Sequence, residues 1–226
     1  MNGKRGKIPT QTAYVFLALS STFFVHFVAK RDVSSVTDMY GMFEEAFDYD
    51  QPMHDWDVRR VTNTGFMFAQ TRSFDQPLNS WNVSSVTDMS TMFWRASKFN
   101  QPLHEWDVSN VISMNSMFHL ATEFNQALDD WDVSSVTSMN SMFLGCLNFN
   151  HDVSKWNVSS LVNARSIFLG SGLNQNLCAW GNSLSRTLEP AFTLERAFGN
   201  TPCPQKDDPD FAIDPPGPFC YDCSTQ

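Results

Sequence analysis

Four cysteines near the C-terminal end are the residues best suited to covalent or metal chemistry. They are Cys178, Cys203, Cys220 and Cys223. An even set outside the regular part of the chain, behind a possible export segment, is typical of two disulfides, and four cysteines permit three pairings. We expect Cys178 to pair with Cys203 and Cys220 with Cys223; a structural zinc site on four thiolates is the alternative in a reducing compartment. Cys146, in an apolar register, is expected to be a buried free thiol.

The other polar residues do not suggest a catalytic site. His54 and His104 share a register but lie two repeats apart, about 10 Å, which is too far for one metal ion. Asp or Asn follows most of the tryptophans, at Asp57, Asn82, Asp107, Asp132 and Asn157. We expect these side chains to hydrogen-bond turn backbone; calcium binding by neighbouring carboxylates is the alternative. We therefore predict no catalytic residue, no metal site, no cofactor and no enzymatic activity.

Two sequons offer a modification site. Asn82 and Asn157 each begin an Asn-Val-Ser triplet, which matches the acceptor pattern for N-glycosylation. The same triplet arises whenever the Asp of the repeat is replaced by Asn. Asn82 and Asn157 are therefore candidate acceptors.

These residues are positioned by a strict repeat. Tryptophan recurs every 25 residues, at Trp56, Trp81, Trp106, Trp131 and Trp156. A fixed period of this length indicates a solenoid, in which each coil buries its apolar face against its neighbours. Within a coil, Val86–Thr87 favours a short strand, and apolar residues spaced i, i+3, i+4 and i+7 from Met89 to Ala96 favour a short helix. We predict an α/β solenoid of short parallel strands and short helices with an irregular C-terminal cap.

Solvent-facing registers that vary between repeats are where a solenoid carries recognition. Thr87 lies in a threonine register, Asp88 follows it, and Trp94 and His119 share a more variable register. Trp94 is the best candidate for a contact residue, because exposed tryptophan is enriched in binding hot spots. We predict that Trp94, His119, Thr87 and Asp88 belong to a binding surface.

Three segments follow from the pattern. Residues 1–30 hold a basic cluster followed by an apolar run at 13–29, which indicates a signal peptide or membrane anchor, or else a degenerate first coil. Residues 31–180 form the solenoid. Residues 181–226 form a cysteine-containing cap with a tail rich in proline and aspartate. The chain has 15 Lys and Arg against 24 Asp and Glu, a net charge of -9, which argues against nucleic-acid binding.

The repeat unit 99–124, FNQPLHEWDVSNVISMNSMFHLATEF, resembles the BspA-like leucine-rich repeat of microbial surface proteins, in which Met, Phe and Trp replace most leucines. The resemblance begins at about residue 24 or 32 and ends at about residue 180. Arg59–Arg60 replaces the usual serine pair, and Thr64 replaces Met. It implies a leucine-rich-repeat-like solenoid, secreted or on the cell surface, that mediates adhesion or binds a protein or glycan. It carries over no catalytic residues.

Two other functions stay open. One is an intracellular interaction scaffold with reduced cysteines. The other is a polysaccharide-active solenoid enzyme, which needs an acid pair that breaks the repeat pattern. We expect a monomer, with membrane attachment only through the N-terminal apolar segment.

Overall fold

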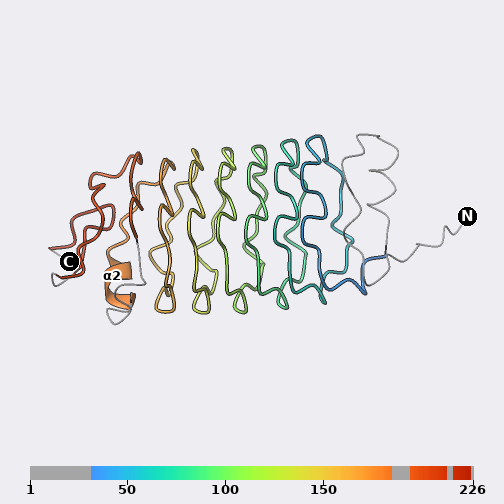
Figure 1. Ribbon diagram of the computed structural model, residues 1–226, viewed down its shortest axis with the longest axis horizontal. Helices are drawn as coiled ribbons and strands as arrows, with labels where there is room; N and C mark the ends of the chain where they lie inside the picture. Colours follow the sequence, from blue (N-terminus) through green and yellow to red (C-terminus); the bar gives the residue numbers. More distant parts are fainter. Residues whose placement is uncertain (1–31, 185–193, 213–215, 225–226) are drawn as a thin grey trace, which may run out of the picture.

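The chain is wound into a row of stacked coils (Figure 1). The computed structural model describes residues 32–184, 194–212 and 216–224, so the predicted signal, anchor or cap coil at 1–30 lies outside the described residues. Coils are joined by backbone hydrogen bonds between residues 24 or 25 apart, such as Phe93 N–H to Met117 O at 2.8 Å and Thr87 N–H to Thr62 O at 2.8 Å. The stacking expected from the period is therefore present.

The predicted secondary structure is wrong. In the described part of the chain the helix is α2, Ala179–Ser183, which has five residues and lies in the cap. Coils meet through isolated parallel bridges instead of strands, at Asp38–Asn63, Asn63–Asp88, Asp88–Ser113, Ser113–Ser138 and Ser138–Asn163. The molecule is not an α/β solenoid of strands and helices.

A series of tight turns replaces the predicted helix at 89–96. Met92 N–H donates to Met89 O at 3.3 Å, whereas Phe93 N–H donates out of the coil to Met117 O. Thr91 and Arg95 have φ of 61° and 56°, which no right-handed helix contains. A positive φ at the third residue of a hydrogen-bonded turn is the pattern of a type II turn. We call residues 39–46 and their equivalents the turn segment; the equivalents are 64–71, 89–96, 114–121, 139–146, 164–171 and 194–201.

Hydrogen bonding explains why turns form here. In the turn segment alternate N–H groups bond three residues back or to the next coil. In a helix nearly every N–H group bonds a carbonyl of the same helix, so few N–H groups would remain to donate to the next coil. The buried carbonyl groups of that next coil would then lack donors, which is unfavourable. The apolar spacing correctly indicates burial, because Met89, Met92, Phe93 and Ala96 are all inaccessible to solvent.

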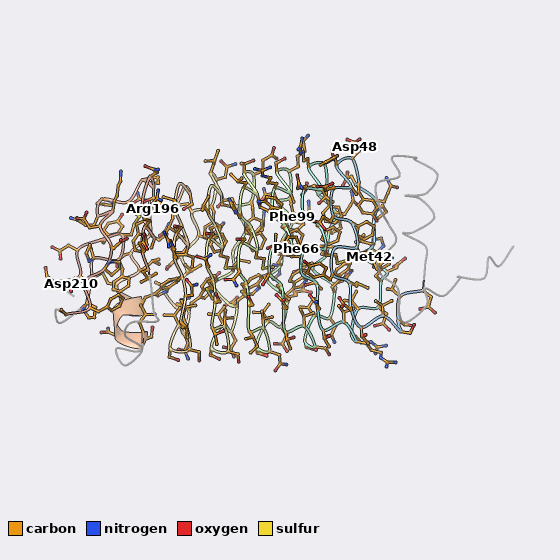
Figure 2. All side chains as sticks on the ribbon, viewed as in Figure 1. Met42, Asp48, Phe66, Phe99, Arg196 and Asp210 are labelled. Carbon is orange, nitrogen blue, oxygen red and sulfur yellow. A yellow bond between two sulfur atoms is a disulfide. The ribbon has the colours of Figure 1, made fainter. Side chains whose placement is uncertain are left out.

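Aromatic side chains stack along the solenoid axis. Phe68, Phe93 and Phe118 follow one another with ring centroids 5.6 Å apart, nearly parallel. A second row contains Phe99 and Phe124, 6.1 Å apart. Figure 2 shows Phe99 inside the stack. Buried rings in offset stacks add to the stabilisation from area burial.

The buried tryptophans at Trp81, Trp106, Trp131, Trp156 and Trp180 also bond to the preceding coil. The Trp106 indole N–H donates to Leu78 O at 2.9 Å, and Trp131 repeats the bond to Leu103 O at 3.0 Å. The rings of Trp106 and Trp131 are 6.5 Å apart and parallel. The polar edge of each of these five indoles is therefore satisfied by a neighbouring coil.

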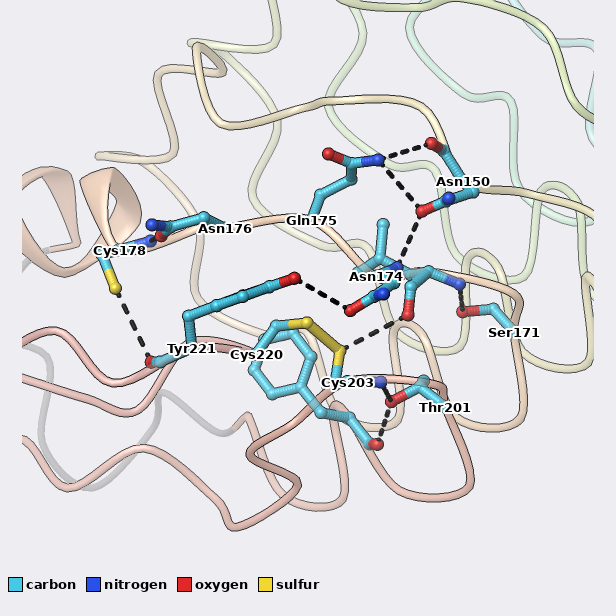
Figure 3. Close-up of a disulfide and its surroundings, with 12 residues drawn as sticks. Asn150, Ser171, Asn174, Gln175, Asn176, Cys178, Thr201, Cys203, Cys220 and Tyr221 are labelled. Carbon is cyan, nitrogen blue, oxygen red and sulfur yellow. Dashed lines mark hydrogen bonds between the residues drawn. A yellow bond between two sulfur atoms is a disulfide. The ribbon is translucent and has the colours of Figure 1, made fainter.

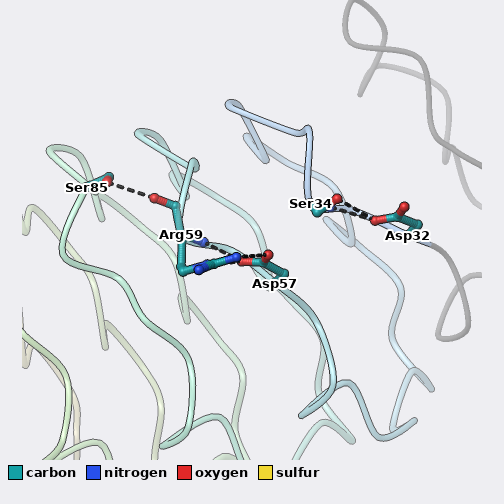
Figure 4. A network of polar contacts seen from close by, with 5 residues as sticks. All are labelled: Asp32, Ser34, Asp57, Arg59 and Ser85. Carbon is teal, nitrogen blue, oxygen red and sulfur yellow. Dashed lines mark hydrogen bonds and ion pairs between the residues drawn. The ribbon is translucent and has the colours of Figure 1, made fainter.

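The Asp and Asn residues after the tryptophans bond turn backbone, as predicted. Asp107 Oδ1 accepts from Ser109 N–H at 3.1 Å. At the second coil Asp57 Oδ1 accepts from Arg59 N–H at 3.3 Å, and Asp57 also binds the Arg59 guanidinium at 2.7 Å. Ser85 of the next coil donates to Arg59 O at 2.8 Å (Figure 4). The pKa of the Asp57 carboxyl lies below its usual range because Arg59 donates to it.

The stack continues into the predicted cap. Ser166 N–H donates to Glu195 O and Gly170 N–H to Gly199 O, both at 2.8 Å. This spacing is 29 residues instead of 24, so 194–201 is a further turn segment displaced by an insertion. Its sequence signal is Leu194, Ala197 and Phe198, which match the registers of Met89, Met92 and Phe93. The insertion hides this match from a search at a fixed period.

Two disulfides close the cap, with a pairing that differs from the prediction. Cys178 pairs with Cys223. Cys203 pairs with Cys220 (Figure 3). The last segment folds back on the cap, where Gln205 N–H donates to Cys220 O at 3.0 Å and Leu177 N–H to Phe219 O at 3.2 Å. These contacts bring each cysteine of 220–223 to a different distant partner. Cys146 is a buried free thiol, as predicted.

Candidate binding surface

The turn segment positions Trp94 on the outside of the stack. Trp94 N–H donates to Thr91 O at 3.1 Å, and Trp94 O accepts from Gln70 N–H at 2.6 Å. The neighbours Met92 and Phe93 point into the core and are fully buried, whereas Trp94 is half-buried. A large aromatic side chain is therefore held at the surface by a backbone that is fixed on both sides.

Two further side chains gather at Trp94. The His119 ring, in the same register of the next coil, lies 6.4 Å from the Trp94 ring, tilted by 48°. The Arg95 guanidinium lies over the Trp94 ring, 5.0 Å from its centroid. Burial, and then the charge of Arg95, lower the pKa of His119, so this imidazole is neutral at pH 7. The group combines two aromatic rings with one positive charge.

Thr87 and Asp88 have structural roles. Thr87 is exposed and its hydroxyl donates to Thr62 O at 3.2 Å. Asp88 Oδ1 accepts from Ser90 N–H at 2.8 Å, which closes a turn. Trp94 and His119 therefore lie together at the surface. Thr87 and Asp88 do not belong to this group, because their side chains hydrogen-bond the backbone of the coils.

The sequence reasoning missed three surface cations beside Trp94. Arg72, Arg95 and Lys98 are all exposed, and Arg72 lies 4.7 Å over the ring of Phe47, which is 42 % exposed. The available signal was that three cations fall within 27 residues of a chain with net charge -9. The three cations occupy different positions of the 25-residue repeat, so comparing one repeat position at a time does not reveal that they lie together.

The other predicted positions lie elsewhere on the surface. Asn82 and Asn157 are both exposed, and Asn82 Oδ1 accepts from Ser84 N–H at 3.1 Å. The described residues contain no group of three His, Cys, Asp or Glu side chains arranged to hold a metal ion. In the same part of the chain no helix is long and apolar enough to cross a membrane; the apolar run 13–29 lies outside it.

A protein-family model matches most of this chain. The model is described as "Mycoplasma protein of unknown function, DUF285", and it matches residues 10–128 and 101–202. The chain belongs to the DUF285 family. The matched residues of this DUF285 chain include the described coils in residues 32–180 and the displaced turn segment at 194–201. Comparison with curated proteins and with solved structures found no match.

Proposed function

We propose that this protein is an exported, non-enzymatic repeat protein that binds a protein or glycan through the turn segments around Trp94. The observation that carries the proposal is the group of Trp94, His119 and Arg95, held at the surface by backbone bonded in both directions. A half-exposed tryptophan on a rigid support loses little conformational entropy on binding, and tryptophan and arginine are enriched in hot spots.

Two features favour export to the cell surface or beyond. The two disulfides, Cys178–Cys223 and Cys203–Cys220, are typical of proteins folded in an oxidising compartment. The resemblance of the repeat to BspA-like surface proteins favours the same location and an adhesive role. An intracellular scaffold of this fold would have no need for a disulfide-linked cap.

Binding is tested with the labelled full chain on intact cells and on surfaces coated with extracellular matrix. We expect saturable binding that Trp94→Ala reduces by at least about tenfold, the loss typical of a hot-spot residue. Leu147→Ala is the matched control, because it also removes an exposed apolar side chain, one that is 60 % accessible. Equal binding by wild type and both variants would exclude the Trp94 surface.

Export is tested by mass spectrometry of the protein from its native cells, alkylated before and after reduction. We expect Cys178, Cys203, Cys220 and Cys223 to react only after reduction. Immediate alkylation of these four thiols in freshly opened cells would contradict the extracellular location.

A further inference from the structure

Three cations form one cluster on adjacent coils, and we call Arg72, Arg95 and Lys98 the cationic cluster. Ser97, which lies between Arg95 and Lys98, donates its hydroxyl to Arg72 O at 3.3 Å. This bond places the loop of Arg72 directly beside the loop of the other two. All three side chains are exposed.

The cluster is not neutralised within the described residues. The ion pairs there with Lys or Arg use Arg59, Lys155 and Arg165, and none includes Arg72, Arg95 or Lys98. Acidic residues lie nearby, and one of them, the exposed Asp48, directly follows Phe47, the ring over which Arg72 lies. Glu45 accepts from the Gln70 amide at 3.1 Å, and Glu123 lies one coil beyond Lys98, where its N–H donates to Ser97 O at 3.1 Å. None of these three acids forms an ion pair with the cluster.

Aromatic rings orient both guanidinium groups. Arg72 lies 4.7 Å over Phe47, and Arg95 lies 5.0 Å over Trp94. A guanidinium that lies over a ring keeps its charge and its N–H donors, which stay available to a planar or tetrahedral anion. Two such groups beside an ammonium are suited to charge-assisted hydrogen bonds with carboxylate or sulfate oxygens.

The surroundings resemble a carbohydrate site more than a peptide or nucleic-acid site. Hydroxyl groups of Ser97 and Thr122 border the cluster, and both keep lone pairs that can accept from a ligand. The half-buried Trp94 ring and the neutral His119 can pack against the apolar C–H face of a sugar. The net charge of -9 opposes a nucleic acid duplex, which carries one negative charge per about 1.7 Å, more strongly than a glycan whose charged groups lie a sugar ring or more apart.

We propose that the cationic cluster, with Trp94, binds an anionic glycan carrying carboxylate or sulfate groups. The proposal rests on the binding function above and names its ligand class. Arg72 and Arg95 contact the anionic groups, Lys98 adds a third positive charge, and Trp94 packs against a sugar ring.

The test uses the full chain in biolayer interferometry against immobilised hyaluronan, chondroitin sulfate, neutral dextran and poly-glutamate, in about 0.15 M salt where charges more than about 8 Å apart are screened. Wild type is expected to bind one or both anionic glycans and not dextran. The triple variant Arg72→Gln, Arg95→Gln, Lys98→Gln is expected to lose at least about tenfold in affinity.

The matched control is the triple variant Arg59→Gln, Arg60→Gln, Lys155→Gln, which changes the net charge equally but lies outside the cluster. It is expected to keep its affinity within about twofold, so that long-range charge effects are separated from contact. Circular dichroism before and after heating verifies that both triple variants fold. A third variant, Arg72→Lys with Arg95→Lys, keeps the charge but removes the planar donors, and we expect an intermediate loss.

Four results would overturn the proposal. The first is an equal loss of affinity in the two triple variants, and the second is binding to poly-glutamate as tight as binding to glycan. The third is Trp94-dependent binding of dextran that the cluster variant leaves unchanged. The fourth is that wild type binds neither anionic glycan. The last three leave the binding function standing if the cell-surface assay still depends on Trp94. Loss of that dependence removes both proposals.

Discussion

Replacing Trp106 by Phe should measure how strongly one coil holds the next. Trp106 is 3 % exposed, its indole N–H donates to Leu78 O at 2.9 Å, and its ring is parallel to that of Trp131. Phe keeps an aromatic ring but removes the donor and part of the buried ring. Leu78 O keeps a second donor, Trp81 N–H at 3.0 Å, so no buried carbonyl is left unpaired.

The magnitude follows from two contributions. The lost hydrogen bond is worth about 0.5–1.5 kcal/mol, and the lost apolar volume with its small cavity about 1–2 kcal/mol. We therefore expect Trp106→Phe to lower the free energy of unfolding by about 2–3 kcal/mol. At about 2–4 °C per kcal/mol for a chain of this size, the melting temperature should fall by about 5–10 °C.

The assay is urea and thermal unfolding followed by far-ultraviolet circular dichroism, because fluorescence would change with the tryptophan itself. Trp94→Phe is the control, since that ring is half-buried and its indole N–H bonds to none of the described residues. We expect the control to change the unfolding free energy by less than about 0.5 kcal/mol. A Trp106→Phe effect no larger than that of the control would refute the structural role assigned to the indole bond.

Three further outcomes are expected. Reduction of the two disulfides, which join residues 45 and 17 positions apart, should lower the unfolding free energy by about 3 kcal/mol or more for each, measured by thermal scans with and without reductant. A Cys146→Ala variant should respond identically, and no change on reduction would contradict the presence of the two disulfides. Gly145→Ala should lower the free energy of unfolding by about 1–2 kcal/mol in urea denaturation, because φ of Gly145 is +67° and the new Cβ would lie 2.6 Å from Leu120 Cδ2. Arg95→Ala, at the equivalent non-glycine position, should lower it clearly less. Burial raises the pKa of the Cys146 thiol, so it should resist iodoacetamide at mildly alkaline pH until the protein unfolds, and rapid labelling of the native protein would show that the core opens.

The period and the burial of each register follow from the residues themselves. A 25-residue repeat with buried Val, Met, Phe and Trp has few ways to cover those side chains other than by stacking. The roles of Asp107 and its equivalents in turn backbone bonding were also predictable, since short polar side chains bond the N–H two residues on. The conformation of the turn segment was not predictable, because the spacing of Met89, Met92, Phe93 and Ala96 is compatible with burial both in a helix and in successive turns.

The candidate site was predictable only in part. Trp94 and His119 share a register, so the repeat itself brings them side by side. Arg72, Phe47 and Lys98 join the site only because certain loops lie next to each other on the surface. The alignment of repeat positions does not show which loops are neighbours.

The amino-acid sequence by itself determined the repeat, the inward and outward registers and the solvent-facing position of Trp94, because all three depend on local spacing and side-chain polarity. Tertiary structure decided the backbone conformation within each coil, because the hydrogen bonds that select turns over helix connect residues 24 or 25 apart. It also decided the disulfide pairing and the cationic cluster. Cys178 and Cys223 meet only after the last segment folds back, and Arg72 reaches the neighbourhood of Arg95 only when one coil is packed on the next.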